Sequence, residues 1–215
     1  MSESKRCKTD HHGDLRNALI VAAAELIEER GSVDFAMIEA ARRAGVSSAA
    51  PYRHFRDREA LLDAVAQVAF IALDQLTGNV AASHTRGSES CIIALAKAYV
   101  GFVTEHPQFY DLMWGDQGLR ITERDLANSG FYVLEDAVSA WCEASEIRDE
   151  DTLGLAVKLW AMAHGLACLA MNHTVDRFMV DADIYALLES STRTFLDGLR
   201  GNLAEKTRLT PEGKR

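Results

Sequence analysis

The chain has 215 residues, 48% of them hydrophobic, so it can bury a sizeable core as one domain or as a small domain joined to a larger one. Three prolines in all, many alanines and leucines, and few β-branched runs predict an all-α fold. The formal net charge of −9 is unusual for a protein that binds DNA. The charge is unevenly distributed, however: residues 1–62 carry ten Lys/Arg and ten Asp/Glu, so the nine excess acids all lie in residues 63–215.

Cysteine usage and the N-terminal residues bear on the cellular compartment. Cys7, Cys91, Cys142 and Cys168 form no C-x-x-C pair and have no histidine at metal-ligand spacing. We therefore expect reduced thiols in a cytoplasmic protein, with no metal site and no cofactor. Residues 1–13 are polar, lack the apolar segment of a secretory signal, and are expected to form a flexible arm.

Two amphipathic or alanine-rich helices are predicted next. Residues 14–30 have apolar side chains at helical spacing, with Asp14 as the expected N-cap and Gly31 at the C-terminal end. Residues 37–44 form a shorter helix, which Gly45 ends because a left-handed backbone costs little only for glycine.

A third, short helix is expected directly after this turn. Ser47 or Ser48 is placed to cap it, and Tyr52 and Phe55 are three residues apart and share one of its faces. Pro51 falls at the fourth helical position if Ser47 is the cap, so either the helix begins later or its first turn is irregular. Helix, glycine turn and short helix together have the spacing of a helix-turn-helix.

This segment lies in a basic patch, residues 42–58, which contains five arginines and one acid, Asp57. Contacts with DNA phosphates require such a local excess of positive charge. The run AGVSSAAPYRHFRDREALL, residues 44–62, resembles the signature of the tetracycline-repressor (TetR) family of bacterial transcription regulators. The resemblance covers roughly residues 14–65 and implies binding to double-stranded DNA. The chain departs from the family at Ala36, where a threonine usually caps the helix and touches a phosphate; Asp34 is the alternative cap.

The resemblance also implies which residues contact DNA. Five residues match positions that contact phosphates or bases, namely Ser47, Ser48, Tyr52, His54 and Arg58. Side-chain chemistry adds Arg43 of the basic patch, Ala49, whose methyl group can contact thymine methyls, and Arg53, which can form a bidentate pair with guanine. Phe55 is assigned to the core, and Tyr52 either to the core or, through its hydroxyl, to a phosphate.

Apolar spacing predicts further helices in the rest of the chain. We expect them over residues 57–76, 89–105, 107–118, 122–145, 150–173 and 181–201, with a polar connector over residues 78–90. The segment 150–173 is apolar on nearly every side and about as long as a membrane span, but Lys158 and His164 would be costly in lipid. We therefore expect it to be buried, in part by a second subunit, and predict no membrane contact.

The same segment contains Trp160, His164 and Gly165 in the pattern W-x-x-x-H-G, which resembles a subgroup of TetR-like regulators named for a Trp-His-Gly motif. Trp160 and His164 share a helix face, and Gly165 allows close approach of a neighbouring helix, as at a four-helix dimer interface. His164 is either a hydrogen-bonded core histidine or a ligand contact. The expected dimer interface comprises Trp160, Gly165, Leu169, Leu188 and Phe195.

A pocket for a small apolar or aromatic effector is expected among the C-terminal helices, although each of its residues could equally belong to the core. Its candidate residues are Phe102, His106, Phe109, Tyr110, Met113, Trp114, Phe131, Trp141, Trp160 and His164.

The predicted architecture is a helix-turn-helix domain of three helices over residues 14–60, a larger helical ligand-binding and dimerisation domain over residues 61–203, and a flexible tail over residues 204–215. The resemblance implies a homodimeric repressor that leaves a palindromic operator when it binds its ligand. A repressor with no small-molecule ligand, or one controlled by a protein partner, is the alternative. An enzyme is disfavoured, because the sequence has no paired carboxylates beside a base, no nucleophile motif and no glycine-rich phosphate loop.

Overall fold

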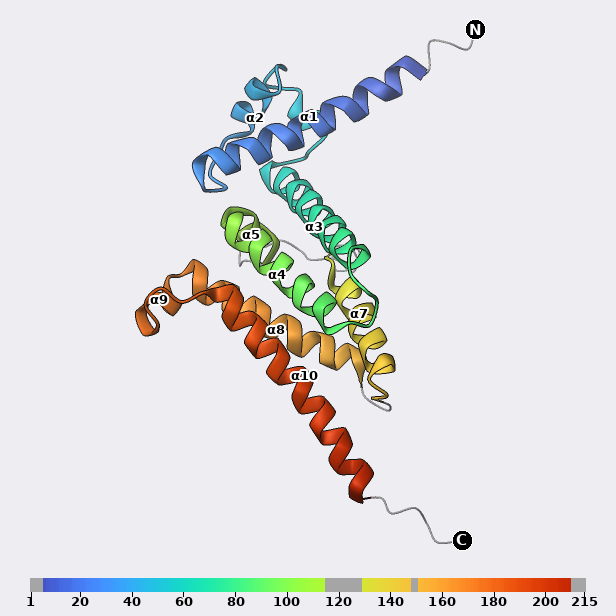
Figure 1. Cartoon of the computed structure of the whole chain (residues 1–215). Helices are drawn as coiled ribbons and strands as arrows, with labels where there is room; N and C mark the ends of the chain where they lie inside the picture. Colours follow the sequence, from blue (N-terminus) through green and yellow to red (C-terminus); the bar gives the residue numbers. More distant parts are fainter. Residues whose placement is uncertain (1–5, 115–128, 148–150, 210–215) are drawn as a thin grey trace. The chain divides into compact units, whose positions relative to one another are not determined.

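The computed structural model describes residues 6–114, 129–147 and 151–209, and in these residues all regular structure is helical (Figure 1). The helices are α1 (Arg6–Arg30), α2 (Met37–Arg43), the 3-10 turn η1 (Pro51–Arg53), α3 (Arg58–Ala82), α4 (Glu89–Glu105), α5 (Pro107–Trp114), α7 (Phe131–Ala144), α8 (Thr152–Met171), α9 (Thr174–Phe178) and α10 (Ile184–Leu209). The all-α prediction is confirmed.

The chain forms two compact units. Unit 1 comprises Met1–Ile71 and His106–Asp125, and unit 2 comprises Ala72–Glu105 and Leu126–Arg215. Because α5 belongs to unit 1, the helix expected in the ligand-binding region lies with the N-terminal helices instead.

The core of unit 1 explains why α5 belongs there. Its buried side chains come from α1, α2, the segment after η1, α3 and α5, and include Leu19, Ile27, Ala40, Phe55, Leu61, Val65 and Leu112. Phe109, on the same helix as Leu112, is partly buried against this cluster. The apolar stripes of these helices therefore face a single core, as amphipathic spacing requires.

Unit 2 is built around α8, which packs against α4, α7, α9 and α10. Its core draws on α4, α7, α8 and α10 and includes Ile92, Leu95, Val138, Trp141, Leu155, Leu159 and Leu196. The side chains of Cys91 and Cys142 lie in the same cluster. Burial raises the pKa of the Cys91 thiol, so it stays protonated at neutral pH.

Several helix ends differ from the predictions. α1 begins at Arg6, so Asp14 lies inside the helix and is not its N-cap, while Gly31 ends it with φ of 62°. Residues 6–13 are polar and show no apolar period, so spacing could not locate this start. α3 runs to Ala82, six residues beyond the predicted end, and shortens the polar connector.

The bounds of the C-terminal helices also differ from the predicted ones. Gly130, with φ of 73°, directly precedes α7, so the predicted helix over 122–145 does not extend through it; residues 122–128 lie outside the described residues. α9 was not predicted, because five residues are too few to show a period. α10 continues to Leu209, into the segment predicted as a flexible tail.

Among the described residues, two helices, α3 and α8, are long and apolar enough to cross a membrane by length and composition, whereas the sequence analysis named only the segment 150–173. Both place large side chains in protein cores: Leu61 and Val65 of α3 in unit 1, and Leu155 and Leu159 of α8 in unit 2. The core helices of globular proteins can be equally long and apolar.

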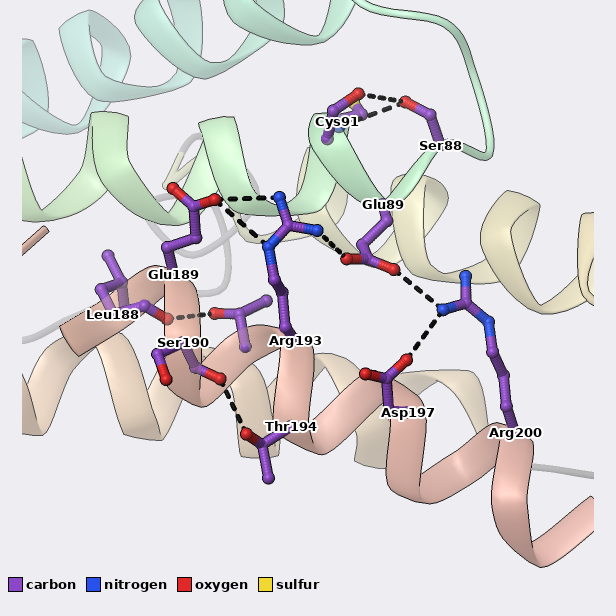
Figure 2. Close-up of polar contacts among 12 residues, drawn as sticks. Ser88, Glu89, Cys91, Leu188, Glu189, Ser190, Arg193, Thr194, Asp197 and Arg200 are labelled. Carbon is purple, nitrogen blue, oxygen red and sulfur yellow. Dashed lines mark hydrogen bonds and ion pairs between the residues drawn. The ribbon is translucent and has the colours of Figure 1, made fainter. Parts of the chain in front are cut away.

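Charged side chains tie α10 to α4 in unit 2 (Figure 2). Glu89, at the start of α4, accepts hydrogen bonds from Arg193 and, at 2.9 Å, from Arg200. Glu189 pairs with Lys97 of α4 at 2.5 Å and with Arg193 at 2.9 Å. The guanidinium carbon of Arg200 lies 5.1 Å from the ring centroid of Trp141 and caps this core residue.

Candidate DNA-binding and effector sites

The turn after α2 has the geometry that its glycine predicts. Gly45 adopts a φ of 71°, and no atom lies within 4 Å of a Cβ built on it. The N–H of Val46 donates to the Ala41 carbonyl at 2.9 Å, and the N–H of Gly45 to the Arg42 carbonyl at 3.1 Å. These bonds satisfy the last carbonyls of α2, so the helix stops here and the chain turns.

The segment after the turn is not the α-helix that the sequence predicts. Most of its hydrogen bonds join residues three apart, as from Ala50 N–H to the Ser47 carbonyl and from His54 N–H to the Pro51 carbonyl, both 2.9 Å. The Phe55 N–H donates to the same Pro51 carbonyl, four residues back, at 2.9 Å. Only Pro51–Arg53 form a 3-10 turn. Pro51 has no N–H to donate and crowds the preceding turn, so the predicted irregularity extends over the whole segment.

This irregular segment nevertheless separates a buried side from an exposed one. Pro51 and Phe55 are buried, Phe55 with 4% of its surface exposed. Tyr52 is 60% exposed, which removes the core alternative for this residue. The predicted DNA contacts Ser47, Ser48, Ala49 and Arg53 are exposed, and His54 is half-buried.

The arginines of the basic patch differ in their partners. Arg43 pairs with Glu29 at 2.5 Å and with Glu25 at 3.5 Å. The hydrogen bond from Arg43 holds the pKa of Glu29 below its usual range. Arg56 is largely exposed and pairs at 2.8 Å with the neighbouring Asp57.

Arg58, which the resemblance assigns to DNA contact, is bonded to the protein's own backbone. Its Nε donates to the Phe35 carbonyl at 2.9 Å, and its Nη2 donates to the Val33 carbonyl. Its guanidinium carbon lies 5.5 Å from the centroid of the Phe35 ring. A contact between residues 25 apart leaves no local sequence signal.

The start of α2 lacks the threonine cap that the family usually has at this position. Ala36 is the N-cap residue and forms no side-chain cap. Glu39 accepts the Ala36 N–H at 2.8 Å and pairs with Arg30 at 2.5 Å. The prediction that Asp34 caps the helix is therefore wrong; its carbonyl instead accepts a hydrogen bond from Arg30 at 2.9 Å.

The ten predicted pocket residues fall into two sets. His106, Phe109, Tyr110, Met113 and Trp114 belong to unit 1, and Phe102, Phe131, Trp141, Trp160 and His164 belong to unit 2. Within unit 1, Met113 is fully buried and the Trp114 ring lies 5.1 Å edge-on from Phe70, as in a packed core.

In unit 2, three of the predicted residues form a contiguous aromatic group. The ring centroids of Phe131 and Trp160 are 6.0 Å apart, and those of Trp160 and His164 are 5.3 Å apart. Trp141 is only 1% exposed in the core. Tyr99, which sequence reasoning missed, bonds through its hydroxyl to His164 Nδ1 at 2.7 Å. Burial lowers the pKa of His164, so the neutral ring is favoured. The ring is hydrogen-bonded but only partly buried, and a ligand contact stays a prediction.

The five predicted dimer residues differ in how far their own chain buries them. A Cβ added at Gly165 would meet no atom within 4 Å, Leu169 is 48% exposed, and Trp160 is partly buried. Leu188 is fully buried inside its own chain, and Phe195 packs partly buried against the core of unit 2. Leu188 is therefore corrected from an interface residue to a core residue. Leu153 and Val157, which were not predicted, are exposed on α8.

Models of known protein families match two parts of the chain. Residues 19–65 match the model of the bacterial regulatory proteins of the tetR family, and residues 92–195 match that of a tetracyclin repressor-like C-terminal domain. The uncharacterized HTH-type transcriptional regulator YobS of Bacillus subtilis (strain 168) is 26% identical over 199 residues, which cover 87% of this chain and 93% of that protein.

Solved structures share the fold of this chain. A protein of unknown function from Rhodococcus sp. RHA1 is 30% identical, covers 86% of this chain and 95% of its own, and superposes with a TM-score of 0.75. The regulator FadR of Bacillus subtilis, in complex with stearoyl-CoA, shares the fold with 15% identity, 84% and 97% coverage and a TM-score of 0.64. With its helix-turn-helix inside the N-terminal match and its W-x-x-x-H-G pattern inside the C-terminal one, the chain belongs to the TetR family of transcriptional regulators.

Proposed function

We propose that the protein is a sequence-specific repressor that acts in the cytoplasm as a homodimer, binds a palindromic operator and is released by a small apolar or aromatic effector. The observation that carries the DNA-binding part is the exposed face of residues 47–53, which presents two serines, an alanine methyl, Tyr52 and Arg53 beside the basic patch. Buried Pro51 and Phe55 fix this face to the core of unit 1.

Each exposed group has a DNA partner of matching chemistry. The serine and tyrosine hydroxyls can donate to phosphate oxygens, which position the protein without reading sequence. Arg53 can donate to the O6 and N7 of guanine in the major groove, and Ala49 can contact a thymine methyl. Small side chains at residues 47–50 allow the backbone to approach the bases closely.

The homodimer is supported by apolar surface that α8 leaves exposed. Leu153 and Val157 expose it near the start of the helix and Leu169 near its end, where Gly165, four residues before Leu169, leaves space for a facing helix. Apolar side chains around a glycine are typical of two helix pairs that pack as a four-helix interface. A twofold dimer presents its two reading segments about 34–36 Å apart, matching successive major grooves and hence a palindromic operator.

The effector part rests on the aromatic group of unit 2. Phe131 and Trp160 offer aromatic surface, and the Tyr99–His164 hydrogen bond adds polar atoms beside it. Apolar surface with a few polar groups suits a small apolar or aromatic molecule. FadR, whose fold this chain shares, was solved in complex with stearoyl-CoA, which supports effector binding by a protein of this fold. Binding releases DNA only if the effector prefers the conformer that binds DNA poorly.

The test is a fluorescence-anisotropy titration with the DNA upstream of the protein's own gene, at stated salt and against competitor DNA. We expect specific binding with one dimer per site, strongly weakened by Arg53→Ala. Equal binding to all DNA would contradict the sequence-specific repressor.

The alternative is a repressor without a small-molecule ligand, or one controlled by a protein partner. Trp160 and Phe131 distinguish the two, because a ligand against their rings should change the tryptophan fluorescence of the protein. A chemical library screened on wild type and on Trp160→Phe would reveal such a ligand as a signal that only the wild type gives. A screen without any such signal would favour control by a partner.

A further inference from the structure

The segment that leads from α1 into α2, residues 31–36, is held by a side chain of α3. Arg58 donates from Nε to the Phe35 carbonyl at 2.9 Å and from Nη2 to the Val33 carbonyl. Its guanidinium also lies over the Phe35 ring, which is 4% exposed in the core of unit 1. A planar group with fixed N–H directions suits this double task better than an ammonium group would.

A second arginine holds the same segment from α1. Arg30 donates to the Asp34 carbonyl at 2.9 Å and pairs with Glu39 at 2.5 Å. Glu39 in turn accepts the N–H of Ala36, the N-cap of α2, at 2.8 Å. The backbone from Val33 to Ala36 is therefore bonded to side chains of α1, α2 and α3.

We propose that Arg58 is a positioning residue of the DNA-binding unit: together with Arg30 it fixes the backbone that enters α2, where Ala36 supplies no side-chain cap. A threonine at residue 36 would accept a backbone N–H of the first turn of α2. Without it, the direction in which α2 starts depends on the bonds to the two arginines. Since α2 leads directly into the reading segment, the same bonds fix the position of residues 47–53.

This role differs from a phosphate contact, which is what the position of Arg58 implies by resemblance. Each guanidinium nitrogen faces a protein oxygen: Nε and Nη2 face the two carbonyls, and Nη1 lies 3.8 Å from Glu59 Oε1. The side chain is 30% exposed, whereas that of Arg56, two residues earlier, is 82% exposed. Reaching a phosphate would require Arg58 to leave the carbonyls that it binds.

The inference rests on the proposed DNA binding, so its test has one measurement with DNA and one without. Without DNA, amide hydrogen exchange is measured on wild type, Arg58→Lys and Arg58→Ala. We expect faster exchange of the Phe35 and Ala36 amides in both variants, and Arg56→Ala should leave these amides unchanged. Arg58→Lys keeps the charge and the long side chain, so it serves if Arg58→Ala does not fold. Unchanged protection in Arg58→Lys would overturn the proposal.

With DNA, the affinity of folded variants is measured over a range of salt concentrations. Arg58→Lys should lose about tenfold or more in affinity, as for a lost charge-assisted hydrogen bond, with an unchanged dependence on salt. A phosphate contact predicts the opposite: Arg58→Lys binds like wild type, and Arg58→Ala lowers the slope of log K against log salt by about 0.9 per contact. That result would overturn the proposal.

Rescue by Ala36→Thr separates positioning from a general loss of stability. In the Arg58→Lys background the threonine should restore the protection of residues 36–40 and most of the affinity, whereas in wild type it should change the affinity less. Equal effects of Ala36→Thr in the two backgrounds would contradict the coupling. If wild type shows no DNA binding at all, the proposed function fails, and hydrogen exchange alone still decides whether Arg58 holds the segment.

Discussion

Tyr52 and Phe55 lie three residues apart in one short segment, yet replacing each by alanine should have opposite consequences. Phe55 is 4% exposed in the core of unit 1, and the Arg16 guanidinium carbon lies 5.3 Å from its ring centroid. Removing a buried phenyl group costs about 3–5 kcal/mol through lost burial and the cavity left behind. The lost cation–π contact at this exposed arginine adds roughly 0.5 kcal/mol. Phe55→Ala should therefore lose a large part of the stability of unit 1.

Tyr52 is the matched control. Its ring is 60% exposed, so Tyr52→Ala should change the free energy of unfolding by less than about 0.5 kcal/mol, as for surface substitutions. The assay is urea unfolding followed by circular dichroism, together with operator affinity at a temperature where both variants are folded. We expect Tyr52→Ala to weaken DNA binding with near wild-type stability. If Phe55→Ala cost less than about 1 kcal/mol, or Tyr52→Ala cost more, the assignment of the two faces of this segment would be refuted.

Three further predictions follow from the site and the interface. Arg53→Ala should relax discrimination at one operator position by about 1–3 kcal/mol, measured by binding to a set of single-base operator variants; discrimination retained at every position would exclude Arg53 as a base reader. The hydrogen bond from Arg30 holds the pKa of Glu39 at about 2, so the stability that this carboxylate contributes is complete above its ordinary pKa of 4.5 and is lost as pH falls through about 2. Carboxyl NMR titration should show this value, and Arg30→Gln should raise it; a Glu39 pKa near 4.5 in wild type would show that the pair does not form in solution. Gly165→Leu should weaken the dimer by about 1–3 kcal/mol for each overpacked side chain, measured by analytical ultracentrifugation, whereas Gly78→Leu, at another helical glycine with no atom within 4 Å of an added Cβ, should leave the dimer intact.

Local chemistry predicted the fold where a single residue determines the outcome. α4 begins at Glu89 and α5 at Pro107, as predicted. Pro107 marks its boundary because proline is favoured at the first position of a helix and ends the helix before it. Gly31 and Gly45 end α1 and α2 with positive φ for the same kind of reason. By contrast, the early start of α1 at Arg6 and the five-residue α9 have no apolar period that could reveal them.

The candidate sites were predicted less completely, because their decisive contacts join distant residues. Arg58 lies in the family's signature, but its bond to the Val33 carbonyl spans 25 residues and depends on how α3 packs against the α1–α2 segment. Tyr99 and His164 are 65 residues apart, and only the packing of α4 on α8 brings them together. Leu188 lies on an apolar stripe of α10, and spacing alone does not distinguish a stripe that faces the same chain from one that faces a partner.

The connections between the two units bear on how an effector could change DNA affinity. Within the described residues the chain passes between them twice, inside α3 at Ile71–Ala72 and between α4 and α5 at Glu105–His106. The second connection is a break, because Pro107 cannot continue the helix before it, and changes in φ and ψ can be absorbed there. The first is an uninterrupted helix whose early residue Leu61 lies in the core of unit 1. We therefore expect the continuous helix α3 to carry a shift of its unit 2 end into unit 1, while the same shift at the end of α4 need not reach it. We expect substitutions in unit 2 that alter DNA affinity to do so through α3.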